Sequence, residues 1–166
     1  RHDRLGALYG LADDWRAEAI VTAAHARFLM RMYWRAQVTV SVPRIRPSAS
    51  GFQPRVEVGD RDLAQIVCAM RLGMPDAGIV LSTREPAGLR DGLHRIGVTH
   101  TSAGSHTEPG GYEHPGEAEE QFEIADERSP AEVAAALRAM GYDPVWGDPS
   151  TPEGMARALR GTAAVG

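Results

Sequence analysis

The feature of this sequence that most limits its possible folds is an alternation of short apolar runs with longer stretches of helical periodicity. The runs QVTVSV at 37–42 and AGIVLS at 77–82 are rich in β-branched and aliphatic residues, which favour strands. A segment long enough to hold a helix separates them, as the connection between two parallel strands requires. The pattern therefore predicts an α/β chain with a parallel sheet, either doubly wound or part of a (β/α) barrel.

The same reasoning places the remaining elements. Apolar residues at helical spacing predict helices, and Asp, Ser and Pro near their first residues are typical of helix N-termini. Strands are expected at 5–11, 37–42, 77–82, 98–103 and 119–126, and helices at 14–35, 61–75, 86–97 and 129–141.

Two of these helices are expected to supply much of the core. Asp13 is expected to cap the first and Asp60 the second, and each helix should turn one apolar face inward. Cys68 lies on the apolar face of the second helix, and it is expected to be a core residue with no base to activate its thiol. The inward residues are expected to be Ile20, Ala24, Phe28 and Leu29 in the first helix, and Leu63, Ile66, Val67, Met70 and Leu72 in the second.

The composition narrows the class of protein. With 166 residues the chain is long enough for one domain with a hydrophobic core. Its net charge of −4 argues against a dedicated nucleic-acid-binding protein, which needs a basic surface. The single cysteine and the absence of a signal-peptide pattern at 1–15 lead us to expect a cytoplasmic protein without a membrane span. Because the chain begins with Arg1 and not Met, we expect processing or a longer parent protein.

Polar residues follow three of the first four predicted strands, and parallel strands bring their carboxyl ends to one edge of a sheet. A guanidinium binds a carboxylate through two hydrogen bonds, and a hydroxyl completes such recognition. Arg84 and Ser102 would thus suit an amino-acid substrate, unless Arg84 instead pairs with Glu85 or Asp91. The polar residues at these ends are Arg44, Ser82, Thr83, Arg84, Ser102 and Ser105.

Arg44 and Arg46 leave two interpretations open. Their guanidinium groups lie beyond a strand end, where they could bind a carboxylate or a phosphate. They could equally pair with Asp60 and Glu57. The nearby GALYGL segment lacks the spacing and the Lys-Ser/Thr pair of a phosphate-binding loop.

The segment after residue 103 has two further features. Ser105 and Thr107 lie in a glycine-flanked turn that could present backbone N–H groups to an anion, although a plain turn is favoured. The histidines are too scattered for a typical zinc site and are interpreted as surface residues. They are His94, His100, His106 and His114.

Several segments together carry a family resemblance. The most specific are LSTRE, followed by SAGSHTEPGGY and EQFEIADERS, and they are supported by GALYGL, VTVSVPRIRP and DRDLAQIVCAMRL. In order and up to Trp146, these resemble the carboxyl-terminal half of the 2-iminoacetate synthases. Those enzymes are the radical S-adenosylmethionine tyrosine lyases of thiamine biosynthesis. Residues 147–166 depart from the family's usual ending.

The resemblance implies a fold and a reaction. Residues 1–112 would form the last β/α units of a (β/α) TIM-type barrel, and 113–166 a carboxyl-terminal extension shared with biotin synthase relatives. The family cleaves S-adenosylmethionine at a 4Fe-4S cluster, and the resulting radical breaks the Cα–Cβ bond of tyrosine to give 2-iminoacetate and p-cresol. Thiazole synthase, which receives the imine, is the expected protein partner.

The cluster of the family needs three closely spaced cysteines, and this chain has only Cys68. We therefore expect no metal site and no lyase activity from this chain alone. Half a barrel would leave two sheet edges and an open interior, so we also expect poor stability or association when the chain is isolated.

The resemblance also implies where ligands bind. Because the radical would be generated outside this chain, no catalytic residue is expected within it. Arg84 and Ser102 would hold the ammonium and carboxylate of the substrate. Second choices for the substrate are Ser82, Thr83 and Ser105, and the residues that resemble positions near S-adenosylmethionine are Arg44, Gly6 and Gly10.

Other functions stay open at this point. One is the related tyrosine lyase of hydrogenase maturation, or a tryptophan lyase. The maturase carries a cysteine motif in its tail, which this chain lacks. Another is a non-catalytic module that binds an amino acid, and a third is a histidine-based metal protein.

Overall fold

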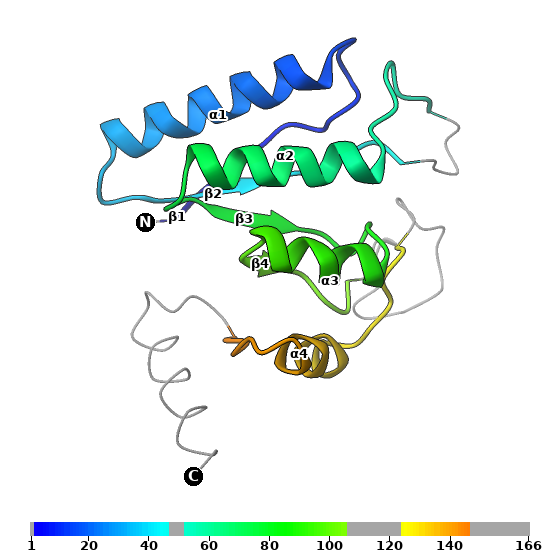
Figure 1. Ribbon diagram of the computed structural model, residues 1–166. Helices are drawn as coiled ribbons and strands as arrows, with labels where there is room; N and C mark the ends of the chain where they lie inside the picture. The colour runs from blue at the N-terminus through cyan, green and yellow to red at the C-terminus, as the bar shows by residue number, and fades with distance from the viewer. Residues whose placement is uncertain (1, 47–51, 106–123, 147–166) are drawn as a thin grey trace. The chain divides into compact units, whose positions relative to one another are not determined.

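The computed structural model describes residues 2–46, 52–105 and 124–146, and a parallel sheet lies at the centre of its first compact unit (Figure 1). The four strands follow the order β1-β2-β3-β4, and each neighbouring pair is parallel. The predicted α/β class with a parallel sheet is therefore confirmed. The strands are β1 (His2–Gly6), β2 (Gln37–Ser41), β3 (Gly78–Leu81) and β4 (His100–Thr101), connected by α1 (Trp15–Met32), α2 (Asp60–Gly73) and α3 (Ala87–Ile96).

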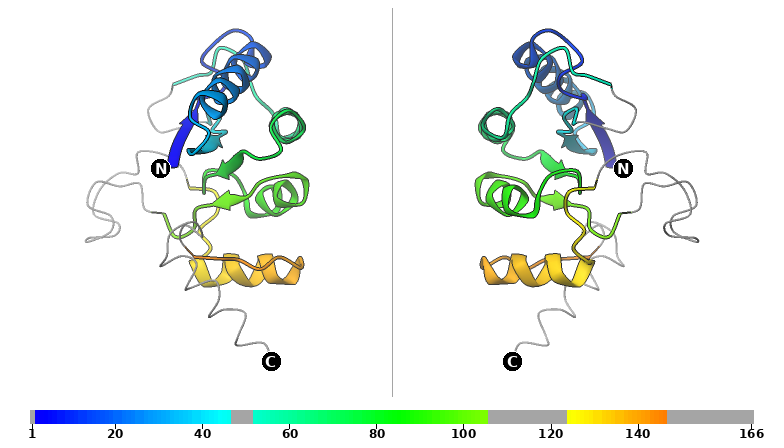
Figure 2. Two further views of the ribbon diagram at one scale, coloured as in Figure 1. Left: turned by 90° about the vertical axis from the view of Figure 1, so that its left-hand side faces the viewer. Right: turned by 90° about the vertical axis from the view of Figure 1, so that its right-hand side faces the viewer.

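The helices and the sheet share one core. Figure 2 shows α2 and α3 on the same side of the strands, as right-handed crossovers between neighbouring parallel strands require. Among the described strands the order shows no reversal of the kind found in a doubly wound sheet. Alternate residues of a strand face opposite sides, so one set from β2 and β3 packs under the helices. This set is Val38, Val40, Ile79 and Leu81.

The second compact unit begins at Pro130. Its described part contains α4 (Pro130–Ala139), which starts at the proline predicted for its first turn. The division at 112/113 that the resemblance implies stays a prediction.

Several strand limits differ from those expected. β1 ends at Gly6, where pairing with β2 stops, whereas the apolar run continues to residue 11. Tyr9 then forms an isolated parallel bridge with Arg44. β4 has only two residues, and residues 124–126 of the expected strand 119–126 lie outside any strand, while 119–123 lie outside the described residues.

The face that α1 buries was predicted wrongly. Ile20 and Phe28 are 70% and 56% exposed, and Ala24 is exposed as well. The helix instead buries Trp15, Thr22 and Ala26, with Leu29 partly buried beside them. Besides Trp15, the buried face carries small residues such as Ala23 and Ala26, which allow the helix to approach the sheet closely.

The core face of α2 is confirmed except at its edges. Leu63, Ile66, Val67 and Met70 are buried, as their spacing predicts. Cys68 is exposed, and Leu72 is 86% exposed. Cys68 lies one residue, or about 100° of helix, beyond the buried Val67, which carries it out of the core.

The helix caps also shift by one residue. Asp14, rather than Asp13, caps α1 by accepting a hydrogen bond from the Arg16 N–H at 2.8 Å. Gly59 is the N-cap of α2, where Asp60 is the first helical residue. The Asp62 carboxylate accepts from the Gly59 N–H at 3.0 Å. Within the described ranges, no helix is both long and apolar enough to cross a membrane.

The exposure of Cys68 can be tested directly. We expect the native protein to react with Ellman's reagent without denaturant, because the thiol lies on the outer side of α2. Cys68→Ser should change the free energy of unfolding by less than about 0.5 kcal/mol. A thiol that reacts only after unfolding would contradict this placement.

Gly6 tests the packing between β1 and β2. A Cβ at this position would lie 2.6 Å from the backbone oxygen of Ser41. We expect Gly6→Ala to lower the free energy of unfolding by about 1–3 kcal/mol, measured by urea denaturation. The matched control is Gly92→Ala in α3, where nothing lies within 4 Å of the added Cβ. It should raise stability by up to about 1 kcal/mol.

Candidate functional site

The polar residues predicted to bind a ligand gather at the carboxyl ends of β3 and β4. Leu81 of β3 is in register with Thr101 of β4, and the Ser102 N–H donates to the Leu81 carbonyl at 3.3 Å. Ser82 and Ser102 thus follow neighbouring strand ends, and both side chains are half-buried. Parallel pairing therefore brings together the two segments that the sequence analysis selected.

The first of two ionic networks ties the end of β2 to the loop after β3. Arg44 donates through Nε to Glu85 Oε1 at 2.9 Å and through Nη2 to Glu85 Oε2 at 2.5 Å. The Arg44 and Glu85 side chains are 4% and 3% exposed. A two-bond guanidinium–carboxylate pair has a defined geometry, and burial removes the water that would compete for it. We call Arg44, Arg46, Asp60 and Glu85 the Arg44 cluster.

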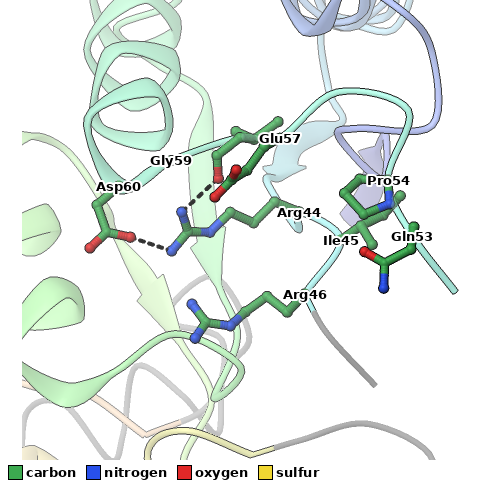
Figure 3. A pocket seen from close by; sticks show the side chains of 9 residues that line it. Arg44, Ile45, Arg46, Gln53, Pro54, Glu57, Gly59 and Asp60 are labelled. Atoms are coloured by element: carbon green, nitrogen blue, oxygen red, sulfur yellow. Dashed lines mark hydrogen bonds and ion pairs between the residues drawn. The ribbon is translucent and has the colours of Figure 1, made fainter. Parts of the chain in front are cut away.

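Arg44 also reaches the start of α2 (Figure 3). Its Nη1 donates to the Val58 carbonyl at 2.7 Å, and its Nη2 to Asp60 Oδ1 at 2.6 Å. Burial by itself lowers the pKa of the guanidinium, but the hydrogen bonds and charges of Glu85 and Asp60 outweigh it and raise that pKa. Arg44 is therefore a permanent cation joining three segments of chain.

This arrangement bears on the two interpretations of Arg44. The pairing with Asp60 is observed, and the second carboxylate is Glu85 rather than the expected Glu57. Arg46 donates to Glu85 Oε2 at 3.3 Å from a side chain that is 28% exposed. Both arginines line a pocket with Gln53, Pro54 and Glu57 (Figure 3). A role near S-adenosylmethionine stays a prediction for Arg44.

The loop after β3 carries Arg84 between two buried residues. Thr83 and Glu85 are 3% and 2% exposed, whereas the Arg84 side chain is half-buried. Burial lowers the pKa of Arg84, and the charge of Glu85 opposes that effect. The Arg84 N–H donates to the Ser82 hydroxyl at 3.4 Å, which shapes the turn. Thr83 contributes its carbonyl, which accepts from Ala125 and Asp126 N–H groups, both at 3.0 Å.

The second ionic network contacts the backbone of Ser102 at the end of β4. Arg90 of α3 is 1% exposed and donates to the Asp126 carboxylate, the Thr101 hydroxyl and the Ser102 carbonyl. Arg128 donates to the same carboxylate through Nε at 2.9 Å and Nη2 at 2.8 Å. It also bonds both oxygens of Asp91, at 3.1 and 3.0 Å. We call Arg90, Asp91, Asp126 and Arg128 the Arg90 cluster.

Asp126 is ionised within this cluster. Burial alone would raise the pKa of its carboxyl, but hydrogen bonds from Arg128 and the charge of Arg90 outweigh burial and leave that pKa below its usual value. Burial lowers the pKa of Arg90, against the charge and hydrogen bond of Asp126. An arginine remains charged despite such a shift, so Arg90 and Asp126 form a true ion pair.

The two glycines linked by resemblance to S-adenosylmethionine each have a structural reason to be glycine. Gly6 faces the Ser41 backbone too closely for any side chain. Gly10 has a φ of 102°, donates to Glu18 Oε2 at 3.1 Å and accepts from Arg55 N–H at 2.9 Å. Cofactor binding by either residue stays a prediction.

The histidines gather into no metal site among the described residues, where no group of three or more His, Cys, Asp or Glu could hold an ion. His94 Nδ1 lies 3.3 Å from the Val98 carbonyl, and burial lowers the pKa of this imidazole. His100 Nδ1 lies 2.8 Å from the Thr99 hydroxyl. His106, Thr107 and His114 lie outside the described residues, and Ser105 is half-buried at the end of the described range.

Arg90 and Asp126 are the residues that the sequence analysis missed. A usable signal was present, because Arg90 lies between Leu89 and Leu93 on the side of α3 that enters the core. A charged residue on a buried helix face requires a buried partner. The sequence does not identify that partner, which lies 36 residues further along the chain.

Comparisons with known proteins agree on the region that this chain resembles. The profile of the Biotin and Thiamin Synthesis associated domain matches residues 41–143. The chain is 43% identical over 144 residues to the 2-iminoacetate synthase of Escherichia coli (strain K12), covering 87% of this chain and 38% of that protein. The 2-iminoacetate synthase of Salmonella typhimurium (strain LT2) is 40% identical over 144 residues, which again cover 87% of this chain and 38% of that protein. The chain thus spans about two fifths of the length of these relatives.

Two similar solved structures are FeFe-hydrogenase maturases. The maturase HydG from Carboxydothermus hydrogenoformans gives a TM-score of 0.76 at 34% identity, covering 98% of this chain and 38% of that chain. A second HydG structure gives 0.78 at 34% identity, covering 95% and 36%.

The buried pair of the Arg44 cluster should matter far more than an exposed pair. Glu85→Gln leaves a buried guanidinium without its full counter-charge, and we expect the free energy of unfolding to fall by about 3–5 kcal/mol. The matched control is Asp13→Asn, which removes an exposed pair with Arg55 at 3.5 Å and should cost less than about 0.5 kcal/mol. Equal losses in urea denaturation would contradict the structure.

Asp126 should make stability depend on pH. Its folded pKa lies below the unfolded value of about 3.9, so its contribution is present above about pH 4 and is lost as the pH falls through the folded pKa. Asp126→Asn should therefore lower the melting temperature at pH 7. Below about pH 4, the melting temperature of this variant should fall less steeply with decreasing pH than that of the unmodified protein. A variant with the acid slope of the unmodified protein would show that Asp126 is not ionised in this way.

Proposed function

The chain belongs to the Biotin and Thiamin Synthesis associated domain family, and from this we propose that it is the carboxyl-terminal, substrate-binding part of a 2-iminoacetate synthase. The family resemblance assigns to such an enzyme the cleavage of the tyrosine Cα–Cβ bond to 2-iminoacetate and p-cresol. The proposed place of action is the cytoplasm, and the proposed recipient of the imine is thiazole synthase.

The placement of Arg84 and Ser102 at adjacent strand ends is the observation that carries this proposal. An α-amino acid presents its carboxylate and its ammonium on one carbon, so the groups that bind them must lie close together. Arg84 follows β3 and Ser102 follows β4, and the register of these strands brings the two segments side by side. The 43% identity to a 2-iminoacetate synthase supports tyrosine as the ligand.

Each residue has a distinct proposed role. The Arg84 guanidinium would donate hydrogen bonds to the substrate carboxylate, for which its fork of N–H groups is suited. The Ser102 hydroxyl would accept a hydrogen bond from the ammonium group. Ser82 and Ser105 would complete the polar wall, and Thr83 would act through its backbone, since its side chain is buried. The whole substrate would be held while chemistry proceeds at its Cα–Cβ bond.

The residues of this chain do not fit an iron–sulfur cluster. Such a cluster needs several thiolate ligands, and the sequence contains only Cys68, which lies exposed on α2. The proposal therefore gives this chain a binding role and derives no redox step from it. S-adenosylmethionine and the cluster, as cofactors of the complete enzyme, would be held chiefly by another part of it.

A partial (β/α) barrel is the architecture that best suits this role. Four parallel strands in sequential order, with helices on one face, correspond to consecutive units of such a barrel. In that architecture substrate sites lie at the carboxyl ends of the strands, where Arg84 and Ser102 are found. The outer edges of β1 and β4, which pair with no further strand among the described residues, would then pair with strands from the remainder of the barrel.

The hydrogenase-maturase type of tyrosine lyase is the second candidate. It is favoured by the similarity to the HydG structures, with TM-scores of 0.76 and 0.78. The identity to the 2-iminoacetate synthases is higher, at 43% against 34%.

The decisive experiment is the isolation of the native protein from its host through an epitope in this segment. We expect an intact mass well above 17.9 kDa with iron and sulfide bound, and formation of p-cresol from tyrosine when S-adenosylmethionine and a reductant are supplied. A mass near 17.9 kDa without iron, and no product, would refute the proposed enzyme. Binding of tyrosine by that short protein would instead indicate a non-catalytic amino-acid-binding module.

Arg84 provides the sharpest single-residue test. Arg84→Met removes the charged hydrogen bonds to the substrate carboxylate, so we expect the dissociation constant for tyrosine to rise about 10- to 150-fold. Arg95→Met, on the exposed side of α3, is the matched control and should leave it unchanged. Titration calorimetry measures both, and an unchanged affinity in Arg84→Met would remove Arg84 from the site.

A further inference from the structure

We propose that Arg90 and Asp126 are positioning residues for the amino-acid site, because their ion pair holds the Arg84 and Ser102 segments at one spacing. This inference rests on the proposed function, in which those two segments bind the substrate's carboxylate and ammonium. It adds a role for two residues that do not themselves touch the substrate.

Arg90 acts on the β4 side. Its Nη2 donates to both the Thr101 hydroxyl and the Ser102 carbonyl, while its Nη1 donates to the Asp126 carboxylate. The guanidinium is rigid and planar, so these three acceptors are held in one fixed arrangement. The bond to Ser102 is made by its backbone oxygen, so the network fixes where the residue lies without using its hydroxyl.

Asp126 acts on the β3 side. Its backbone N–H and that of Ala125 both donate to the Thr83 carbonyl at 3.0 Å. Thr83 immediately precedes Arg84, so the segment 125–126 holds the loop from which the Arg84 side chain extends. The same aspartate therefore bonds the Arg84 loop through its backbone and the Ser102 segment through its carboxylate and Arg90.

Burial makes this link stiff. The Arg90 and Asp126 side chains are 1% and 0% exposed, so water does not compete for the ion pair. Arg128 adds hydrogen bonds from its backbone N–H at 3.1 Å, Nε at 2.9 Å and Nη2 at 2.8 Å, which hold the carboxylate in one orientation. A site that must hold a substrate in a reactive geometry is sensitive to such spacing, since a misplacement of about 1 Å can lower the reaction rate by a factor of about 100.

The test compares ligands that carry one or both groups. The native protein is titrated with tyrosine, with tyramine, which lacks the carboxylate, and with 3-(4-hydroxyphenyl)propionate, which lacks the ammonium. The quantity measured is the ratio of the dissociation constant of each analogue to that of tyrosine. A ligand with one group can adapt to a shifted loop, whereas tyrosine needs both contacts at their original spacing.

Asp126→Asn should lower both ratios about tenfold, mainly by weakening tyrosine binding. Thr101→Val, a milder change that removes one acceptor of Arg90 but no charge, should lower them about threefold and covers the case in which Asp126→Asn does not fold. The control is Asp14→Ala, which removes the cap of α1. It should lower the melting temperature and leave both ratios unchanged.

The outcomes separate the two proposals. Reduced ratios in the Asp126 or Thr101 variant, with unchanged ratios in the Asp14 control, support positioning. Equal weakening of all three ligands, or no weakening in folded variants, overturns it while the proposed function stands. Failure of the unmodified protein to bind tyrosine overturns the proposed function and this inference with it.

Discussion

Buried arginines hold together the carboxyl end of this parallel sheet. Regular strand pairing stops at Ser41, Leu81 and Thr101, and beyond these residues side chains order the loops together with a few backbone contacts such as the Tyr9–Arg44 bridge. Arg44 and Arg90 do so, each by bonding a buried carboxylate and one or more backbone carbonyls. A buried charge is costly unless it is bonded, and this cost restricts the loops to arrangements that supply partners for these guanidinium groups. Arg44 is bonded through all three of its nitrogen atoms, whereas Arg90 is bonded through Nη1 and Nη2 and its buried Nε has no partner in the described part of the chain.

The two clusters meet at the loop after β3. After Arg84, the Glu85 carboxylate accepts hydrogen bonds from Arg44. Before Arg84, the Thr83 carbonyl accepts hydrogen bonds from the backbone of residues 125 and 126. Arg84 lies between these anchors, with a side chain that is only half-buried. The short loop is thus fixed from both sides while its central guanidinium remains near solvent. Such an arrangement suits ligand binding, because little conformational entropy remains to be lost when the ligand is bound.

The sheet is covered by α2 and α3 on one face, and its alternate residues on the other face include Thr39, Ser41, Gly78 and Val80. Three of these four residues are small or polar, whereas the face under the helices is formed by Val38, Val40, Ile79 and Leu81. In the proposed barrel the face with Thr39 and Ser41 lines the interior, and the Arg84 and Ser102 segments form part of its mouth. The chain covers 38% of the length of the Escherichia coli 2-iminoacetate synthase, so in the proposed enzyme further strands of the barrel would come from the remaining part of the protein.

Local sequence patterns were sufficient for the parts of this protein that depend on local physics. β-branched runs placed β2 and β3, helical spacing identified Leu63 to Met70 as the core face of α2, and parallel order placed Arg84 near Ser102. The buried face of α1 required the tertiary structure, because that helix has two apolar stripes and only contact with the sheet selects the one with Thr22 and Ala26. Only the tertiary structure could pair Arg90 with Asp126, since charges 36 residues apart leave no periodic signal and meet solely because the chain folds back on itself.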